Sequence, residues 1–134
     1  MASTAAFFTA PNIGAALLGN AETNLQVPTT TSTLITAAAN GTQVYEVVIE
    51  AAASGTTTTT VAGEVYLFLH DGTTYHLFDV LPVTVVAGTT TLAPFRVNRV
   101  YTNLILKTGW SLRASQSIAG NASLLKAIAF GLDA

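Results

Sequence analysis

Short stretches of alternating apolar and polar residues, separated by turn residues, run through most of the chain after residue 31. The segment over residues 43–52 is the clearest. Glu46 and Glu50 are expected on one face, Val48 is the exception to the alternation, and the opposite face is expected to hold Tyr45, Val47, Ile49 and Ala51. A period of two is typical of a half-buried β-strand. Eight or nine such segments at nearly regular spacing predict an all-β fold: an antiparallel β-sandwich, jelly-roll-like, of about eight strands.

The expected strands are short and follow one another closely. Pro82 is expected to interrupt the strand ladder, and Pro94 is expected to confine its strand to an edge or a bulge. The last segment also suits a helix, because its Ala and Lys residues favour one. We expect strands over residues 33–38, 43–52, 63–70, 73–80, 83–87, 90–97, 102–107, 110–115 and 124–130.

Two turns predict hairpins. Asp71-Gly72 is a strong turn signal, because both residues tolerate the positive φ of a type I′ turn. A two-residue turn there would place Glu64 opposite Asp79, whereas a four-residue loop over 71–74 would avoid that clash and pair Phe68 with Leu77. The sequence leaves both registers open. Thr108-Gly109 predicts a second hairpin, between the segments 102–107 and 110–115.

The first 31 residues follow a different pattern. Their apolar residues are interrupted by Gly and Pro, so we expect a non-sheet N-terminal arm or linker over residues 1–31, ahead of a sandwich domain over 32–134. A short helix over residues 11–18 is one alternative, and an extended arm is the other. Phe7 and Phe8 need burial, either on their own domain or on a neighbouring molecule.

The charge pattern indicates an unusual surface. Only 9% of the 134 residues are charged, against about 25% in typical soluble domains. Such a surface gives little protection from self-association, which suggests that much of it is covered by protein. Residues 1–95 hold six of the seven acidic residues, and every Lys or Arg follows residue 95. Internal pairing of the two regions is the simpler interpretation, and pairing across subunits is the alternative.

The sequence offers no disulfide and no export or membrane signal. It contains no Cys, its first residues lack the basic region of a signal peptide, and no apolar run approaches the roughly 20 residues of a membrane span. We therefore expect neither export by that route nor a membrane partner.

Candidate catalytic and metal-binding residues are few. His70, Asp71, His76 and Asp79 have the residue types of metal ligands, but even-numbered loops place the two histidines on opposite faces of the hairpin. Ser111 lacks the second glycine of a nucleophile elbow, since the segment reads Gly-Trp-Ser-Leu-Arg. We expect no enzyme activity, no metal and no cofactor.

Paired carboxylates do not change this expectation. Glu46 and Glu50 lie on one predicted strand, roughly 13 Å apart along it, which is too far for glycoside hydrolysis. A nucleic-acid partner is not expected either, because basic residues are few and the net charge is −2. The basic candidates, interleaved with Tyr101 and Trp110, are Arg96, Arg99, Lys107 and Arg113.

Three stretches together resemble small virion proteins of tailed bacteriophages, namely the accessory capsid proteins of the decoration or cement kind. The stretches are residues 65–79 (VYLFLHDGTTYHLFD), 110–115 (WSLRAS) and 129–131 (AFG), and the resemblance covers about residues 60–134. It implies a jelly-roll or related sandwich fold and a dimer or trimer on the outer capsid surface. The implied partner is the major capsid protein, and the implied site of synthesis is the cytoplasm of a bacterial host.

This resemblance and the uncharged surface lead to the same expected function, a structural subunit that stabilises a phage head. The residues expected to contact the partner are Phe7 and Phe8 in the arm and Arg96, Arg99 and Arg113 in the basic region. One rival is a head-fibre or tail-type module that binds a receptor or carbohydrate, which exposed aromatic residues would favour. Another is a cupin-like enzyme, which would need clustered His ligands.

Overall fold

The described residues form two antiparallel sheets. The structure is a computed structural model, and it describes residues 7–51, 59–87, 95–122 and 124–134. A short 3-10 helix, η1 (Ala119–Asn121), joins the last two strands. The strands are β1 (Ala10–Leu17), β2 (Ser32–Thr36), β3 (Thr42–Ala51), β4 (Gly63–His70), β5 (Tyr75–Val83), β6 (Phe95–Leu106), β7 (Ser111–Gln116) and β8 (Leu125–Asp133).

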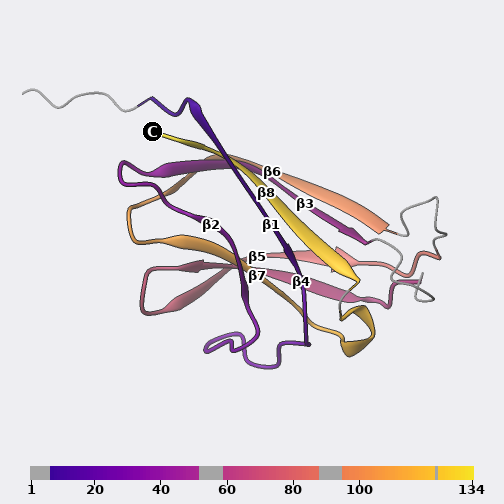
Figure 1. Cartoon of the computed structure of the whole chain (residues 1–134). Coiled ribbons are helices and arrows are strands. Elements are labelled where there is room, and N and C mark those ends of the chain that lie inside the picture. Colours follow the sequence, from indigo (N-terminus) through magenta and orange to yellow (C-terminus); the bar gives the residue numbers. More distant parts are fainter. Residues whose placement is uncertain (1–6, 52–58, 88–94, 123) are drawn as a thin grey trace, which may run out of the picture.

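The two sheets are stacked as the layers of a sandwich (Figure 1). The strand order is β1-β8-β3-β6 in one sheet, here called sheet A, and β2-β7-β4-β5 in the other, sheet B. Consecutive strands change sheet at every connection except β4–β5. This interleaving is the strand order of an eight-stranded jelly roll. The predicted antiparallel β-sandwich is therefore confirmed.

The core lies between the sheets and is built from alternate residues of the inner strands. Apolar residues of β3 and β8 face those of β4 and β7, and small Ala residues in β7 and β8 let the layers approach. Burial of this apolar area is the main force that holds the layers together. Fully buried members include Val47, Ile49, Val65, Leu67, Leu112, Ala114, Ala127 and Ala129.

The β4–β5 hairpin has the four-residue loop of the two expected alternatives. His70 pairs with Tyr75 and Phe68 with Leu77, and a register shift follows between Leu67 and Phe68. Glu64 consequently lies opposite Pro82 rather than Asp79. The loop avoids the like-charge pair that a two-residue turn would have created.

The expected non-sheet arm is wrong for residues 10–17. These residues form β1, which pairs along its whole length with β8, so the helical alternative for 11–18 is wrong as well. Gly14 makes this possible, because a Cβ there would overlap the main-chain oxygen of Leu34 in β2. The absence of a side chain thus lets β1 pass close to the opposite sheet.

Three details of the expected strands are also corrected. Pro82 does not interrupt β5, which continues to Val83 because an edge strand tolerates a residue without an N–H. Residues 95–97 and 102–106, from two expected strands, belong to one strand, β6, which bulges where Asn103 adopts a φ of 62°. The Thr108-Gly109 turn joins β6 to β7 in different sheets, so it is not a hairpin.

Other expectations fall partly outside the described residues. The first part of the expected strand 90–97, with Pro94, lies there. The ambiguous segment 124–130 is a strand, because Leu125–Asp133 forms β8 between β1 and β3.

Candidate functional site

Within the described residues, the outer face of sheet A carries exposed large apolar side chains on β1, β3 and β6. Pairing of the four strands aligns their outward side chains in rows that cross the sheet in the order β1, β8, β3, β6. The rows are Pro11–Leu132–Gln43–Ile105, Ile13–Phe130–Glu46–Val100, Ala15–Ile128–Val48–Asn98 and Leu17–Lys126–Glu50–Arg96. Three of the four rows are dominated by apolar side chains.

Much of this apolar surface is exposed. The exposed fraction is 65% for Val100, 60% for Ile13 and 53% for Ile105. Tyr45, from the bulge in β3, packs on Phe130 with ring centroids 6.3 Å apart. Solvent-facing sides of antiparallel sheets normally carry polar residues. Contiguous apolar patches of this kind mark interaction surfaces more often than free surface.

The charges on this face balance, and three of the four lie in the last row. Lys126 and Arg96 flank Glu50 in the last row, and Glu46 in the second row accepts a hydrogen bond of 2.9 Å from Asn98 Nδ2. Two positive and two negative groups give a face without net charge. A neutral apolar face can meet protein without long-range repulsion.

The outer face of sheet B is better covered by its own side chains. Phe68 points outward yet has no exposed surface, because it makes edge-to-face contacts with Tyr66 and Tyr75. Arg113 lies over the ring of Tyr75 and donates a hydrogen bond of 3.0 Å to its hydroxyl oxygen. Leu77 is 40% exposed on this face. Val80 is 38% exposed on the same face, so among the described residues sheet B presents fewer exposed large apolar side chains than sheet A.

The structure does not bring the three predicted arginines together. Arg96 is exposed on the outer face of sheet A, whereas Arg113 lies on the outer face of sheet B. Arg99 binds Asp79 across the edge of the sandwich at 3.2 Å. Tyr101 donates a hydrogen bond of 2.7 Å to the same carboxylate, and burial together with this bond raises the pKa of Tyr101. This contact supports internal pairing of acidic and basic regions.

Phe7 and Phe8 lie just ahead of β1. Phe7 is 75% exposed, and Phe8 is half-buried. The backbone N–H of Thr9 donates to the carbonyl of Asp133, which fixes this segment to the end of β8. Phe7 is thus an apolar ring at the margin of sheet A that its own domain does not cover.

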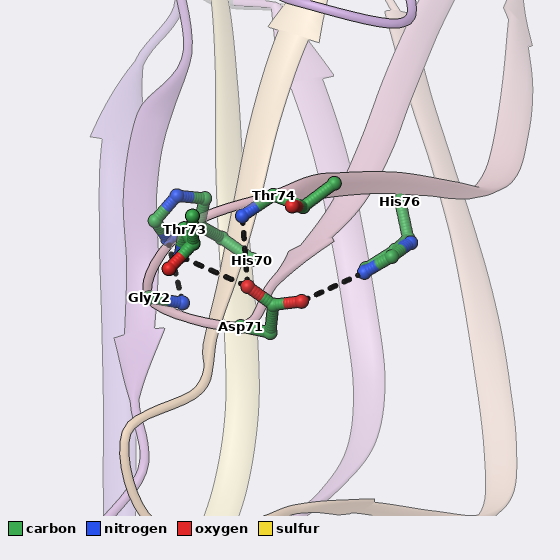
Figure 2. A network of polar contacts seen from close by, with 6 residues as sticks. All are labelled: His70, Asp71, Gly72, Thr73, Thr74 and His76. Atoms are coloured by element: carbon green, nitrogen blue, oxygen red, sulfur yellow. Dashed lines mark hydrogen bonds and ion pairs between the residues drawn. The ribbon is translucent and has the colours of Figure 1, made fainter.

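The two hairpin histidines lie in separate contacts. The Asp71 carboxylate accepts hydrogen bonds from the backbone of Thr73 and Thr74, and it lies 3.1 Å from His76 Nε2 (Figure 2). Hydrogen bonds from Thr74, His76 and Thr73 lower the pKa of Asp71 to about 2. His70 turns to the other side, where its ring packs on Tyr75. The hydrogen bonds of the Asp71 carboxylate thus hold the turn closed, and this network is called the Asp71 clasp below.

Catalytic constellations are likewise not assembled within the described part of the chain. There, no three side chains of His, Asp or Glu gather as metal ligands. Ser111 accepts a hydrogen bond from Arg113 Nε at 3.1 Å, which is no general base. The described residues also contain no helix with the length and apolar character that crossing a membrane requires.

Glu22 is a structural residue that the sequence pattern did not reveal. It is only 5% exposed, and its carboxylate accepts hydrogen bonds from the backbone of Thr23, Asn24, Thr29 and Thr30 and from the Thr30 hydroxyl. Burial alone would raise the pKa of Glu22, but these hydrogen bonds outweigh it and lower the pKa. A lone acid ahead of a Thr- and Asn-rich loop was the available signal.

No family model, curated protein or solved structure matches this chain. The interpretation of its surfaces therefore depends on the geometry described above.

Proposed function

We propose that the chain is a structural virion protein, a decoration or cement subunit that stabilises a phage head by binding the major capsid protein. The observation that carries this proposal is the neutral, largely apolar outer face of sheet A. A subunit that works inside an assembly keeps such a face covered, by another copy of itself or by another shell protein, whereas a free monomer would expose it to unwanted contacts.

The strand order is consistent with this role. Jelly rolls of eight strands are common among viral capsid domains, although lectins and cupins share the architecture. Fold alone therefore does not decide between these classes. A cupin-like enzyme gains no support from the described residues, where His70 and His76 lie in separate contacts.

The carbohydrate-binding alternative has weaker support. Sugar-binding sites need exposed aromatic rings beside polar groups. Tyr66, Tyr75 and Trp110 are each half-buried, and Trp110 is stacked on His76 with ring centroids 5.9 Å apart. These rings cover the sandwich itself, and Tyr45, which is 39% exposed on sheet A, packs on Phe130. The decoration role is therefore the better supported of the two.

Binding of the purified full chain to phage heads that lack it tests the proposal. Co-sedimentation should show saturable binding at a fixed ratio to the major capsid protein, and electron microscopy should place extra density on the outer surface. Heads that stay bare at saturating protein, while the chain is found in a fibre or tail, would contradict the decoration role.

The contribution of the N-terminal aromatic residues is tested separately. Deletion of residues 2–20 is unsuitable, because it would remove β1 from sheet A. The double variant Phe7→Ser, Phe8→Ser leaves the sheet intact and should weaken head binding about tenfold or more if these rings are anchors. Val85→Ser, at an exposed site outside the sheets, is the control and should bind as the wild type does.

Among the three arginines expected to contact the partner, exposed Arg96 is the best candidate, because Arg99 and Arg113 make contacts within the chain. Arg96→Glu should weaken head binding most at low salt, because an exposed charge acts over about 10 Å at 0.1 M salt. Arg99→Glu would break the contact with Asp79 and destabilise the domain instead. Head binding by the Arg96 variant that equals wild type at low and high salt would remove the electrostatic part of the proposal.

A further inference from the structure

We propose that the outer face of sheet A packs against the same face of a second copy, around a twofold axis that runs parallel to the strands above the seam between β8 and β3. This inference rests on the proposed structural role, since it names the neighbour that covers the apolar face.

The row of charges selects this arrangement. A twofold axis along the β8–β3 seam places β8 of one copy over β3 of the other, and β1 over β6. Lys126 then faces Glu50 of the second copy, and Glu50 faces its Lys126. Two opposite-charge pairs form across the interface, both in the same row of the sheet.

The apolar rows are compatible with the same axis. Ile13 on β1 is 60% exposed and faces Val100 on β6, which is 65% exposed. Val48 lies opposite Ile128 of the second copy but is only 3% exposed, so it adds little contact area. Glu46 is the one acid within the apolar rows, and its hydrogen bond with Asn98 reduces the cost of covering it. Strands then run nearly parallel in the two facing layers, which is the common aligned packing of sheets.

An axis perpendicular to the strands fits less well. It would place the charged row over the row of Pro11, Leu132, Gln43 and Ile105. Lys126 would then lie over Leu132, and Glu50 would lie over Gln43. Such an arrangement desolvates the charges without pairing them, which is costly.

The size of the face sets the expected strength. Four strands about 4.8 Å apart and seven residues long cover about 400 Å² in projection. Two copies then bury on the order of 1,000 Å² in total, which is near the lower limit of specific interfaces. We therefore expect a dimer with a Kd of about 1–100 µM in solution, strengthened where a shell holds many copies together.

A matched pair of variants tests the face. Val100→Lys introduces a charge opposite Ile13 of the second copy, whereas Val85→Lys introduces it outside sheet A at a site with nearly the same exposure, 64% against 65%. Sedimentation equilibrium of each full chain should show a dimer for wild type and Val85→Lys. Val100→Lys should dissociate at least about tenfold more readily, with an unchanged circular dichroism spectrum.

A charge exchange tests the axis. Lys126→Glu and Glu50→Lys should each weaken the dimer, because each places like charges face to face. An equimolar mixture of the two variants should form a heterodimer, since one chain then carries two carboxylates at these positions and faces two ammonium groups on the other chain. The double variant Lys126→Glu, Glu50→Lys in one chain should restore the dimer, because it exchanges the two charges and keeps both pairs.

Three outcomes overturn this inference. The first is a wild-type chain that stays monomeric at about 500 µM, well above the expected Kd. The second is an equal effect of Val100→Lys and Val85→Lys on dimerisation. The third is an equimolar mixture of the two charge variants that forms no heterodimer. These measurements use no phage heads, so their failure would leave the proposed head binding unaffected. Failure of head binding by a chain that dimerises would conversely contradict only the proposed attachment to a shell.

Discussion

At the scale of single residues, two carboxylates secure loops that have little apolar content of their own. The Glu22 carboxylate accepts hydrogen bonds from backbone N–H groups within residues 23–30, and the Asp71 carboxylate accepts them from Thr73 and Thr74. Both carboxylates have a lowered pKa. Local composition predicted the Asp71 turn, because Asp-Gly is a known turn pair. The signal at Glu22, a lone acid ahead of a Thr- and Asn-rich loop, is too weak to mark a buried acid.

Glu22→Ala is expected to destabilise the domain by about 3 kcal/mol, because it leaves several partly buried donors without an acceptor. Urea unfolding should show this as a lower midpoint with an unchanged slope. Glu64→Ala is the control, since Glu64 is exposed, and it should change the unfolding free energy by less than about 0.5 kcal/mol. Equal midpoints for the two variants would show that Glu22 does not hold the loop.

The Asp71 clasp predicts a dependence on acid pH. Its folded pKa of about 2 lies below the ordinary value of 3.8, so the contact stabilises the protein above about pH 4 and loses this effect as the pH falls toward 2. Asp71→Asn keeps an acceptor for Thr73 and Thr74 but cannot ionise.

Urea unfolding of wild type and Asp71→Asn between pH 2 and 6 checks this prediction. The difference in unfolding free energy should favour wild type at pH 6 and shrink as the pH falls through 4 toward 2. A difference that stays constant across this range would show that the carboxylate charge contributes nothing to the folded state.

At the scale of elements, local patterns identified most strands but not their partners. The β4–β5 hairpin was predictable because its turn and its pairing are local in sequence. The β6–β7 connection was not, since Thr108-Gly109 makes an equally good turn within one sheet or between two. Strand β1 was missed because Pro11 and Gly14 argue against a strand in isolation, while pairing with β8 and close approach to β2 overrule them.

The close approach of β1 to β2 yields a sharp prediction. Gly14→Ala should destabilise the domain by about 3 kcal/mol, because the new Cβ would overlap the main chain at Leu34 and backbone yields less than a side chain does. Gly19→Ala is a matched control, since nothing lies within 4 Å of its Cβ position, and its change should stay below about 1 kcal/mol. Thermal unfolding of both variants measures this contrast, and similar melting temperatures would contradict it.

At the scale of the whole molecule, a surface covered by protein explains both the scarcity of charged residues and the apolar outer face of sheet A. The sequence predicted a covered surface from composition alone, because so few charges are left to keep copies apart. It did not predict which surface, since outward residues of β1, β3, β6 and β8 become neighbours only after the strands are ordered. The predicted partner residues Arg96 and Arg113 are separated by the same ordering, onto opposite faces of the sandwich.

The central claim is that protein covers the outer face of sheet A when the chain is at work, and oxidative footprinting measures this directly. Labelling of Tyr45 and Phe130 on sheet A is compared with labelling of Tyr66 on sheet B, in dilute chain, in concentrated chain and on the particle that contains it. We predict strong protection of Tyr45 and Phe130 in the concentrated and particle samples, with Tyr66 changing less. Equal labelling of the sheet A rings in all three samples would contradict the account.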